Sequence, residues 1–117
     1  AEILIQKSEE NLYFEGVARA VRLIGFYHQS KSNYDSAVHF FKASSDLYQE
    51  VGDSIEYASV LNNLAGTYYI QGNYQRALEN LLIVIGIHQR YDKKLQLARA
   101  LNNMALIYKK NNQSCTF

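Results

Sequence analysis

Few residues in this chain have the type and spacing that catalysis or metal binding requires. Its three histidines, His28, His39 and His88, stand at intervals that match no metal-ligand pattern. The one cysteine, Cys115, has no evident histidine partner to activate it as a nucleophile, and it cannot form an internal disulfide. The sequence therefore predicts a protein that is not an enzyme and that uses no metal and no cofactor.

The balance of charge argues against nucleic acid as a partner. Twelve Lys and Arg residues stand against eleven Asp and Glu, and the longest cationic cluster is Lys109-Lys110. A nucleic-acid-binding domain normally carries a basic face. The most apolar stretch, residues 81–87, is interrupted by Gly86 and is far shorter than the roughly 18 residues of a membrane span. We expect a protein or peptide partner, no nucleic acid and no membrane; the lone thiol favours the cytoplasm and leaves the location otherwise open.

One stretch of sequence recurs with a period of forty residues. Residues 61–68 read Leu-Asn-Asn-Leu-Ala-Gly-Thr-Tyr, and residues 101–108 read Leu-Asn-Asn-Met-Ala-Leu-Ile-Tyr. A more divergent copy includes Val21, Ile24 and Gly25. A fixed period of this length is typical of stacked helical repeats.

Apolar residues three and four apart predict helices, and the segments between them are short and polar. We expect helices over residues 12–30, 34–51, 55–71, 74–91 and 94–110. Residues 1–10 are interpreted as the tail of a preceding repeat, and residues 111–117 as a mobile tail. Residues 10–16 differ at one position from a common engineered protease-cleavage sequence, but the helix-like residues before them favour a native segment.

The repeated residues resemble those of the tetratricopeptide repeat (TPR) family. In that family, the first helix of each pair has a large residue, then Leu-Gly or Leu-Ala, then Tyr one turn later. The second helix begins with Tyr and has Ala three residues on. The matching residues are Val21, Ile24, Gly25, His28, Tyr34, Ala37 and Phe41; Leu61, Leu64, Ala65, Tyr68, Tyr74, Ala77 and Leu81; and Leu101, Met104, Ala105 and Tyr108.

This resemblance implies an all-α fold, in which antiparallel helix pairs form a right-handed superhelical array, a TPR-like α-solenoid. Residues 12–51 would form repeat 1, residues 54–91 repeat 2, and residues 94–110 the first helix of repeat 3, giving about two full repeats plus flanking single helices. Small residues such as Gly25, Ala65 and Ala105 would let paired helices approach closely. The period exceeds the thirty-four residues usual in the family, so longer helices are expected.

The resemblance also implies a function, because the first helix of each TPR pair lines a concave groove that holds peptides. The groove candidates are Arg19, Arg22, Phe26 and Gln29; Ser59, Asn62, Asn63, Gly66 and Tyr69; and Arg99, Asn102, Asn103, Leu106 and Lys109. Asparagine amides could hold a peptide backbone, since each offers a donor and an acceptor. The cationic side chains could bind carboxylates. We therefore predict an interaction module that binds a peptide or helix of a partner, as part of a larger signalling or scaffolding protein.

Two alternatives concern the polar groove residues. Arg22, Asn63 and Arg99 match three places of the carboxylate clamp of chaperone-adaptor members, but Phe26 and Asn103 depart from it, so that assignment is not adopted. One asparagine of each pair could instead pack against the next repeat and bond to its backbone.

The last predicted helix has an apolar stripe without a partner, formed by Leu101, Met104, Ala105 and Tyr108. Terminal repeats normally carry a polar cap. The stripe would be covered either by a continuation of the array or by a second copy, which predicts a possible homodimer. A structural spacer that self-associates through its terminal helices is therefore the alternative function.

Overall fold

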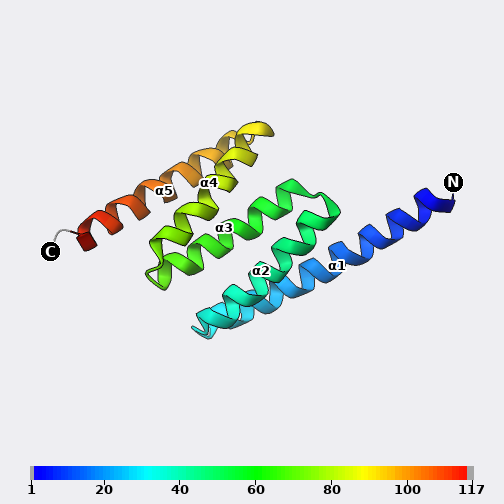
Figure 1. Cartoon of the computed structure of the whole chain (residues 1–117), viewed down its shortest axis with the longest axis horizontal. Helices are drawn as coiled ribbons and strands as arrows, with labels where there is room; N and C mark the ends of the chain where they lie inside the picture. The colour runs from blue at the N-terminus through cyan, green and yellow to red at the C-terminus, as the bar shows by residue number, and fades with distance from the viewer. Residues whose placement is uncertain (1, 116–117) are drawn as a thin grey trace.

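Five consecutive helices build the whole of the described chain. The computed structural model describes the backbone of residues 2–115 and the side chains of residues 9–112. The helices are α1 (Glu2–Ser30), α2 (Tyr34–Val51), α3 (Ser54–Ile70), α4 (Tyr74–Arg90) and α5 (Lys94–Cys115). Each helix packs against the next one in the chain, from α1 on α2 to α4 on α5. Figure 1 shows the resulting zigzag, and the described residues contain no strand, so the all-α prediction is confirmed.

Both terminal helices are longer than the sequence pattern predicted. Helix α1 runs without a break from Glu2, where a separate tail over residues 1–10 was expected. No glycine or proline lies between residues 2 and 15 to stop it. Helix α5 continues to Cys115, past the stop expected near Lys110, because asparagine and serine are weak helix formers but do not break a helix. The last two residues of the expected mobile tail lie outside the described residues.

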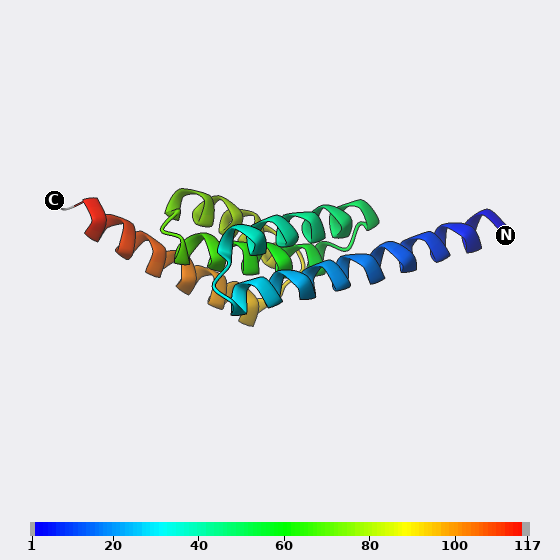
Figure 2. The same cartoon turned by 90° about the horizontal axis from the view of Figure 1, so that it is seen from below.

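The long ends of α1 and α5 project from opposite ends of the molecule. The chain extends over 63 × 33 × 18 Å. Figure 2 shows the N-terminal part of α1 reaching beyond α2 at one end and the C-terminal part of α5 reaching beyond α4 at the other. The middle of the molecule is therefore packed on several sides, whereas the two ends are single helices.

The turns explain why the sequence repeats every forty residues. Each of four turns contains one residue with positive φ, at Ser32, Gly52, Gly72 and Asp92, and these residues are spaced twenty apart. The left-handed conformation ends a helix and reverses the chain, and glycine adopts it without steric cost. A helix and its turn thus take twenty residues, and a pair takes forty.

The core confirms the expected role of Gly25. A Cβ atom at this position would lie 2.8 Å from Cδ1 and Cε1 of Phe41, a side chain that is completely buried. The absence of a side chain thus lets the Phe41 ring pack against the backbone of α1. Ala37, Ala65 and Ala77 are also buried in the contacts between helices.

Helix α5 is packed on one side only. Ala100 and Ile107 are buried, and Met104 packs against the core. Leu101 and Tyr108 are each 48% exposed, whereas their counterparts one repeat earlier, Leu61 and Tyr68, are each 4% exposed. Helix α4 covers the counterparts on α3, but no helix covers the same face of α5 among the described residues. The expected stripe is therefore open at Leu101, Ala105 and Tyr108, whereas its fourth member, Met104, is partly buried against the core.

Candidate functional site

The predicted groove residues lie on α1, α3 and α5 at equivalent turns, but the structure does not bring all of them into one site. Eight are exposed and six are partly buried. The exposed ones are Arg19, Phe26, Asn62, Gly66, Arg99, Asn102, Leu106 and Lys109, and the partly buried ones are Arg22, Gln29, Ser59, Asn63, Tyr69 and Asn103. The rings of Phe26 and Phe41 meet in a T-shaped arrangement, with the ring centroids 5.2 Å apart, so part of the Phe26 side chain belongs to the α1–α2 contact.

An apolar pocket of about 210 Å³ lies between α3 and α5, over α4. Gly66 forms part of its wall, and a Cβ atom there would meet nothing within 4 Å, so the space beside this backbone is open. Tyr69 and Leu106 add partly exposed apolar surface. The lining residues are Asn62, Ala65, Gly66, Tyr69, Leu81, Asn103, Leu106 and Ile107.

A second, more polar pocket of about 290 Å³ follows along the same helices. Asn62 lines both pockets, so they adjoin, and together they are called the α3–α5 groove, with an apolar half and a polar half. The polar half is lined by Ile55, Glu56, Ser59, Asn62, Val84, His88, Gln96, Arg99 and Ala100. Glu56 and Gln96 were not among the predicted groove residues, although their separation of forty residues places them at equivalent repeat positions.

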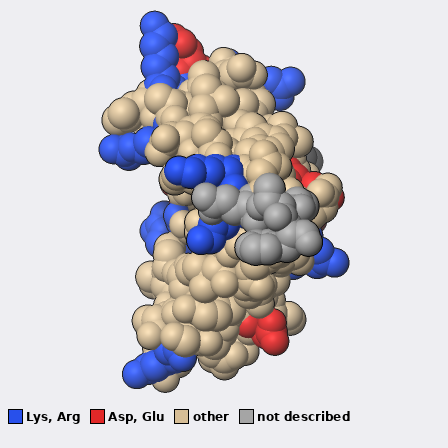
Figure 3. Space-filling view, turned by 90° about the vertical axis from the view of Figure 1, so that its left-hand side faces the viewer, with Lys and Arg blue, Asp and Glu red and all other residues tan. Residues whose placement is uncertain are grey.

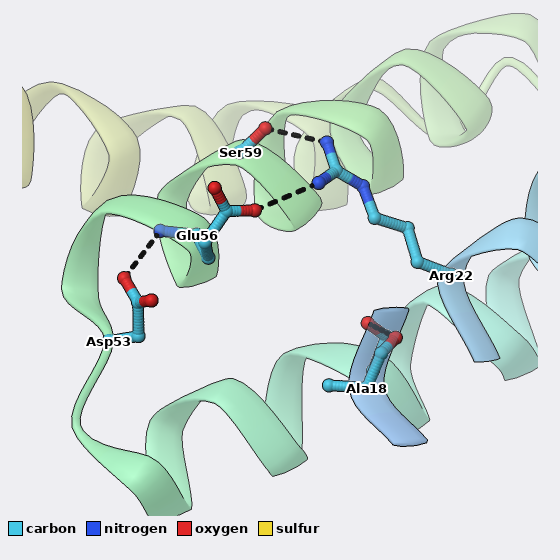
Figure 4. A network of polar contacts seen from close by, with 6 residues as sticks. Ala18, Arg22, Asp53, Glu56 and Ser59 are labelled. Atoms are coloured by element: carbon cyan, nitrogen blue, oxygen red, sulfur yellow. Dashed lines mark hydrogen bonds and ion pairs between the residues drawn. The ribbon is translucent and has the colours of Figure 1, made fainter. Parts of the chain in front are cut away.

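Arg22 does not present its charge to this groove but joins repeat 1 to repeat 2. Its Nη1 donates to Oε2 of Glu56 at 3.1 Å, and its Nη2 donates to Oγ of Ser59 at 2.6 Å. Figure 4 shows the side chain reaching from α1 to the first turns of α3, where the backbone nitrogen of Glu56 donates to the capping residue Asp53. The expectation that Arg22 serves as a groove cation is therefore corrected, because a guanidinium satisfied by these partners has little capacity left for a ligand.

Asn63 belongs to the same α1–α3 contact. In the orientation that its neighbours require, its amide oxygen accepts from Nε and Nη2 of Arg22, both at 3.1 Å. One asparagine of the pair is thus structural, as the alternative interpretation held, but it bonds to a side chain of the preceding repeat. The other, Asn62, stays exposed in the groove.

His88 lies at the buried side of the polar half. It is 8% exposed, and its buried Nδ1 atom has no hydrogen-bond partner among the described residues. Burial first, and the positive charge of Lys93 second, lower the pKa of His88 below its usual value of 6.5, which favours the neutral ring. The sequence had not marked His88 as a core position, but Tyr48, forty residues earlier, is a buried core residue and could have shown this.

The charge beside the groove is positive. Helix α5 carries Lys94, Arg99, Lys109 and Lys110 and no acidic residue. The lining residues of the apolar half include no acidic residue, and Glu56, the acidic residue in the lining of the polar half, is already paired with Arg22. Seen from the C-terminal end of the molecule, Lys and Arg side chains lie near the middle of the surface and also at its top, sides and bottom, and fewer Asp and Glu side chains are visible, at the top and on the right (Figure 3). The site is therefore suited to a ligand with negative charge.

The arrangement of paired antiparallel helices defines an α-solenoid of the TPR type. The sequence matches the tetratricopeptide repeat family over residues 16–82 and again over residues 56–114. The chain belongs to this family, whose members typically act as non-catalytic protein–protein interaction modules.

A solved structure shares this fold. The crystal structure of BtubC (BKLC) from P. vanneervenii superposes with a TM-score of 0.73 and 20% sequence identity, over 80% of this chain. The matched part makes up 39% of that chain, so the present sequence spans well under half of its length. No curated protein sequence matches the chain.

Two further observations concern other kinds of site. No helix in the described part of the chain is both long and apolar enough to cross a membrane. Among the described residues, no group of three or more His, Cys, Asp or Glu side chains could hold a metal ion.

Proposed function

We propose that this chain is a non-catalytic interaction module that binds a peptide or helix of a partner protein in the α3–α5 groove. The observation that carries the proposal is the pair of adjoining pockets that share Asn62. Their linear arrangement along two helices suits a segment of polypeptide, whose successive side chains enter successive pockets. A larger signalling or scaffolding protein is the setting that we infer for such a module.

The two halves of the groove favour a ligand of defined chemistry. The apolar half would accept one large apolar side chain against Tyr69 and Leu106, because burying such a side chain contributes about 1.5–3 kcal/mol. The polar half would accept a carboxylate near Arg99, which is exposed and can make charge-assisted hydrogen bonds. Asn62 lies between the halves and could pair with the peptide backbone.

A peptide-display selection with the whole chain as bait tests this function, because such a selection does not require an identified partner. We expect the enriched peptides to combine an apolar residue with one or more acidic residues. Binding of a selected peptide, measured by calorimetry, should fall at least tenfold with Leu106→Asp, because the apolar half would then contain a charge. It should also weaken with Arg99→Glu, which repels a carboxylate.

The control variant is Leu82→Asp, which changes a similarly exposed leucine on α4 outside both pockets. It should leave the affinity unchanged. If selection enriches no peptide, or if all three variants bind a selected peptide as the unmodified chain does, the groove is not the binding surface.

A further inference from the structure

The N-terminal part of α1 carries apolar side chains that the fold does not cover. Leu12 and Tyr13 are 68% and 67% exposed, and Phe14, whose ring meets Tyr13 edge to face at 5.6 Å, is 36% exposed. This region projects beyond α2 at one end of the molecule (Figures 1 and 2). Successive residues of a helix lie about 100° apart, so these three side chains are spread around the projecting helix, and the touching rings of Tyr13 and Phe14 form its contiguous apolar part.

Helix α5 also has apolar side chains that the fold does not cover, and its charge is opposite to that of the N-terminal part of α1. The open face of α5, formed by Leu101, Ala105 and Tyr108, lacks the helix that α4 provides for α3. Between residues 94 and 112, α5 has four basic residues and no acidic one. Between residues 8 and 18, α1 has Glu9, Glu10 and Glu15 and no basic residue.

We infer that the α1 projection of one copy packs on the open face of α5 of a second copy, in a head-to-tail contact. The projection is helical, apolar and acidic. The open face has room for one helix and is apolar, and by helical spacing Lys94, seven residues before Leu101, and Lys109, four residues after Ala105, lie on the same side of α5. Opposite charges at the two ends favour this pairing over α1 with α1 or α5 with α5, where like charges would meet. The contact goes beyond peptide binding and uses a different face of α5 from the pocket-lining Asn103 and Leu106.

Such a contact joins the α1 projection of one copy to the open face of α5 of another, so each copy of a pair keeps one of these two surfaces unused. A heterologous contact of this kind leads to rings or open chains and does not stop at a dimer unless the geometry closes. We expect the average mass of the unmodified chain to rise with concentration above 13.4 kDa. The average mass should fall again in 1 M salt, because a Debye length of about 3 Å screens the attraction between the acidic and the basic surface.

Two variants with one defective end each give the decisive experiment. Tyr13→Asp impairs the α1 projection, and Leu101→Asp impairs the open face of α5. The two side chains are 67% and 48% exposed, so both variants should keep the fold. Circular dichroism can verify this. Analytical ultracentrifugation should find each variant monomeric alone. An equimolar mixture should form a complex of twice the monomer mass, because one intact head meets one intact tail.

The alternatives give different results. If Tyr13→Asp alone still dimerises, α5 pairs with itself and the head-to-tail contact is wrong. If the mixture stays monomeric, or if the control Leu82→Asp on α4 disrupts association as strongly as Leu101→Asp does, the proposed surfaces are not those in contact. A monomeric unmodified chain at high concentration and low salt would also overturn the inference. Failure of this contact leaves the groove proposal untouched.

Discussion

Gly25 shows how one residue sets the packing of a helix pair. The ring of Phe41 occupies the space that a side chain at this position would need, and Phe41 is buried on all sides, so it has no room to retreat. Gly86 on α4 offers a contrast, because a Cβ atom there would meet nothing within 4 Å. The two glycines therefore separate the effect of packing from that of helix propensity.

We predict that Gly25→Ala lowers the free energy of unfolding by about 1–2 kcal/mol, since the cost of overpacking exceeds the gain in helix propensity. Gly86→Ala, the matched control, should raise it by about 0.5–1 kcal/mol because only the propensity term acts. Urea denaturation of both variants provides the measurement. Equal stabilisation by both changes would show that α1 and α2 are not packed as described.

His88 predicts a dependence of stability on pH. Its pKa is lowered in the folded state by burial and then by Lys93, so the unfolded state binds a proton more readily. The stability is therefore intact above the unfolded pKa of 6.5 and should decrease as the pH falls below it. His88→Phe keeps an aromatic ring at the position that Tyr48 holds one repeat earlier.

Denaturant unfolding at pH 8 and pH 5.5 measures this effect. The stability difference between the two pH values should be smaller in His88→Phe than in the unmodified chain. Both proteins contain His28 and His39, so the change in this difference reports on His88. An unchanged difference would mean that His88 does not cause the pH dependence.

At the scale of the helices, the beginnings of α2 and α3 differ in their capping. The carboxylate of Asp53 accepts a hydrogen bond from the backbone nitrogen of Glu56 at 3.1 Å, whereas Asn33 makes no side-chain capping bond. Asp53→Ala should therefore cost about 1 kcal/mol of stability, the usual value for a lost N-cap. Asn33→Ala should cost clearly less. Thermal unfolding of the two variants compares them, and equal losses would contradict the capping difference.

The five helices and four turns were predicted well from the sequence because the residues that determine them recur along the chain. The same residue types return every forty positions, and the turn residues return every twenty. The ends of α1 and α5 were predicted poorly because no repeat unit flanks them, and the pattern contains no stop signal there. Helix length at an end depends on what breaks a helix, and neither end contains a proline or a glycine at the relevant place.

The lining of the groove follows the repeat register in part. Asn62, Gly66, Tyr69, Asn103 and Leu106, which were predicted to face a peptide groove, line the apolar half, and their role in binding stays a prediction. Arg22 could not be assigned this way, because its partners Glu56 and Ser59 lie on another repeat and share no pattern with it. Charge reversal at Arg22 would thus report on the contact between α1 and α3, and Arg99 is the better probe of the groove.

At the scale of the whole molecule, the helix pairs create two separate kinds of surface. The groove lies between α3 and α5, the open face is another side of the same turns of α5, and the projecting part of α1 lies at the N-terminal end of the molecule. A segment of a partner could occupy the groove while the ends associate with other copies. The module would then bring several bound partners together, which is the behaviour expected of a scaffold.

The most direct test of the proposed groove is to map where a selected peptide binds. Backbone amide chemical shifts of the isotope-labelled chain, recorded by NMR during titration with the peptide, provide this map. We predict that the largest changes fall on Asn62, Gly66, Asn103 and Leu106, with little change at Leu82 on α4. Changes confined to α1 and α2, or to the outer side of α4, would contradict the proposal that the α3–α5 groove is the binding site.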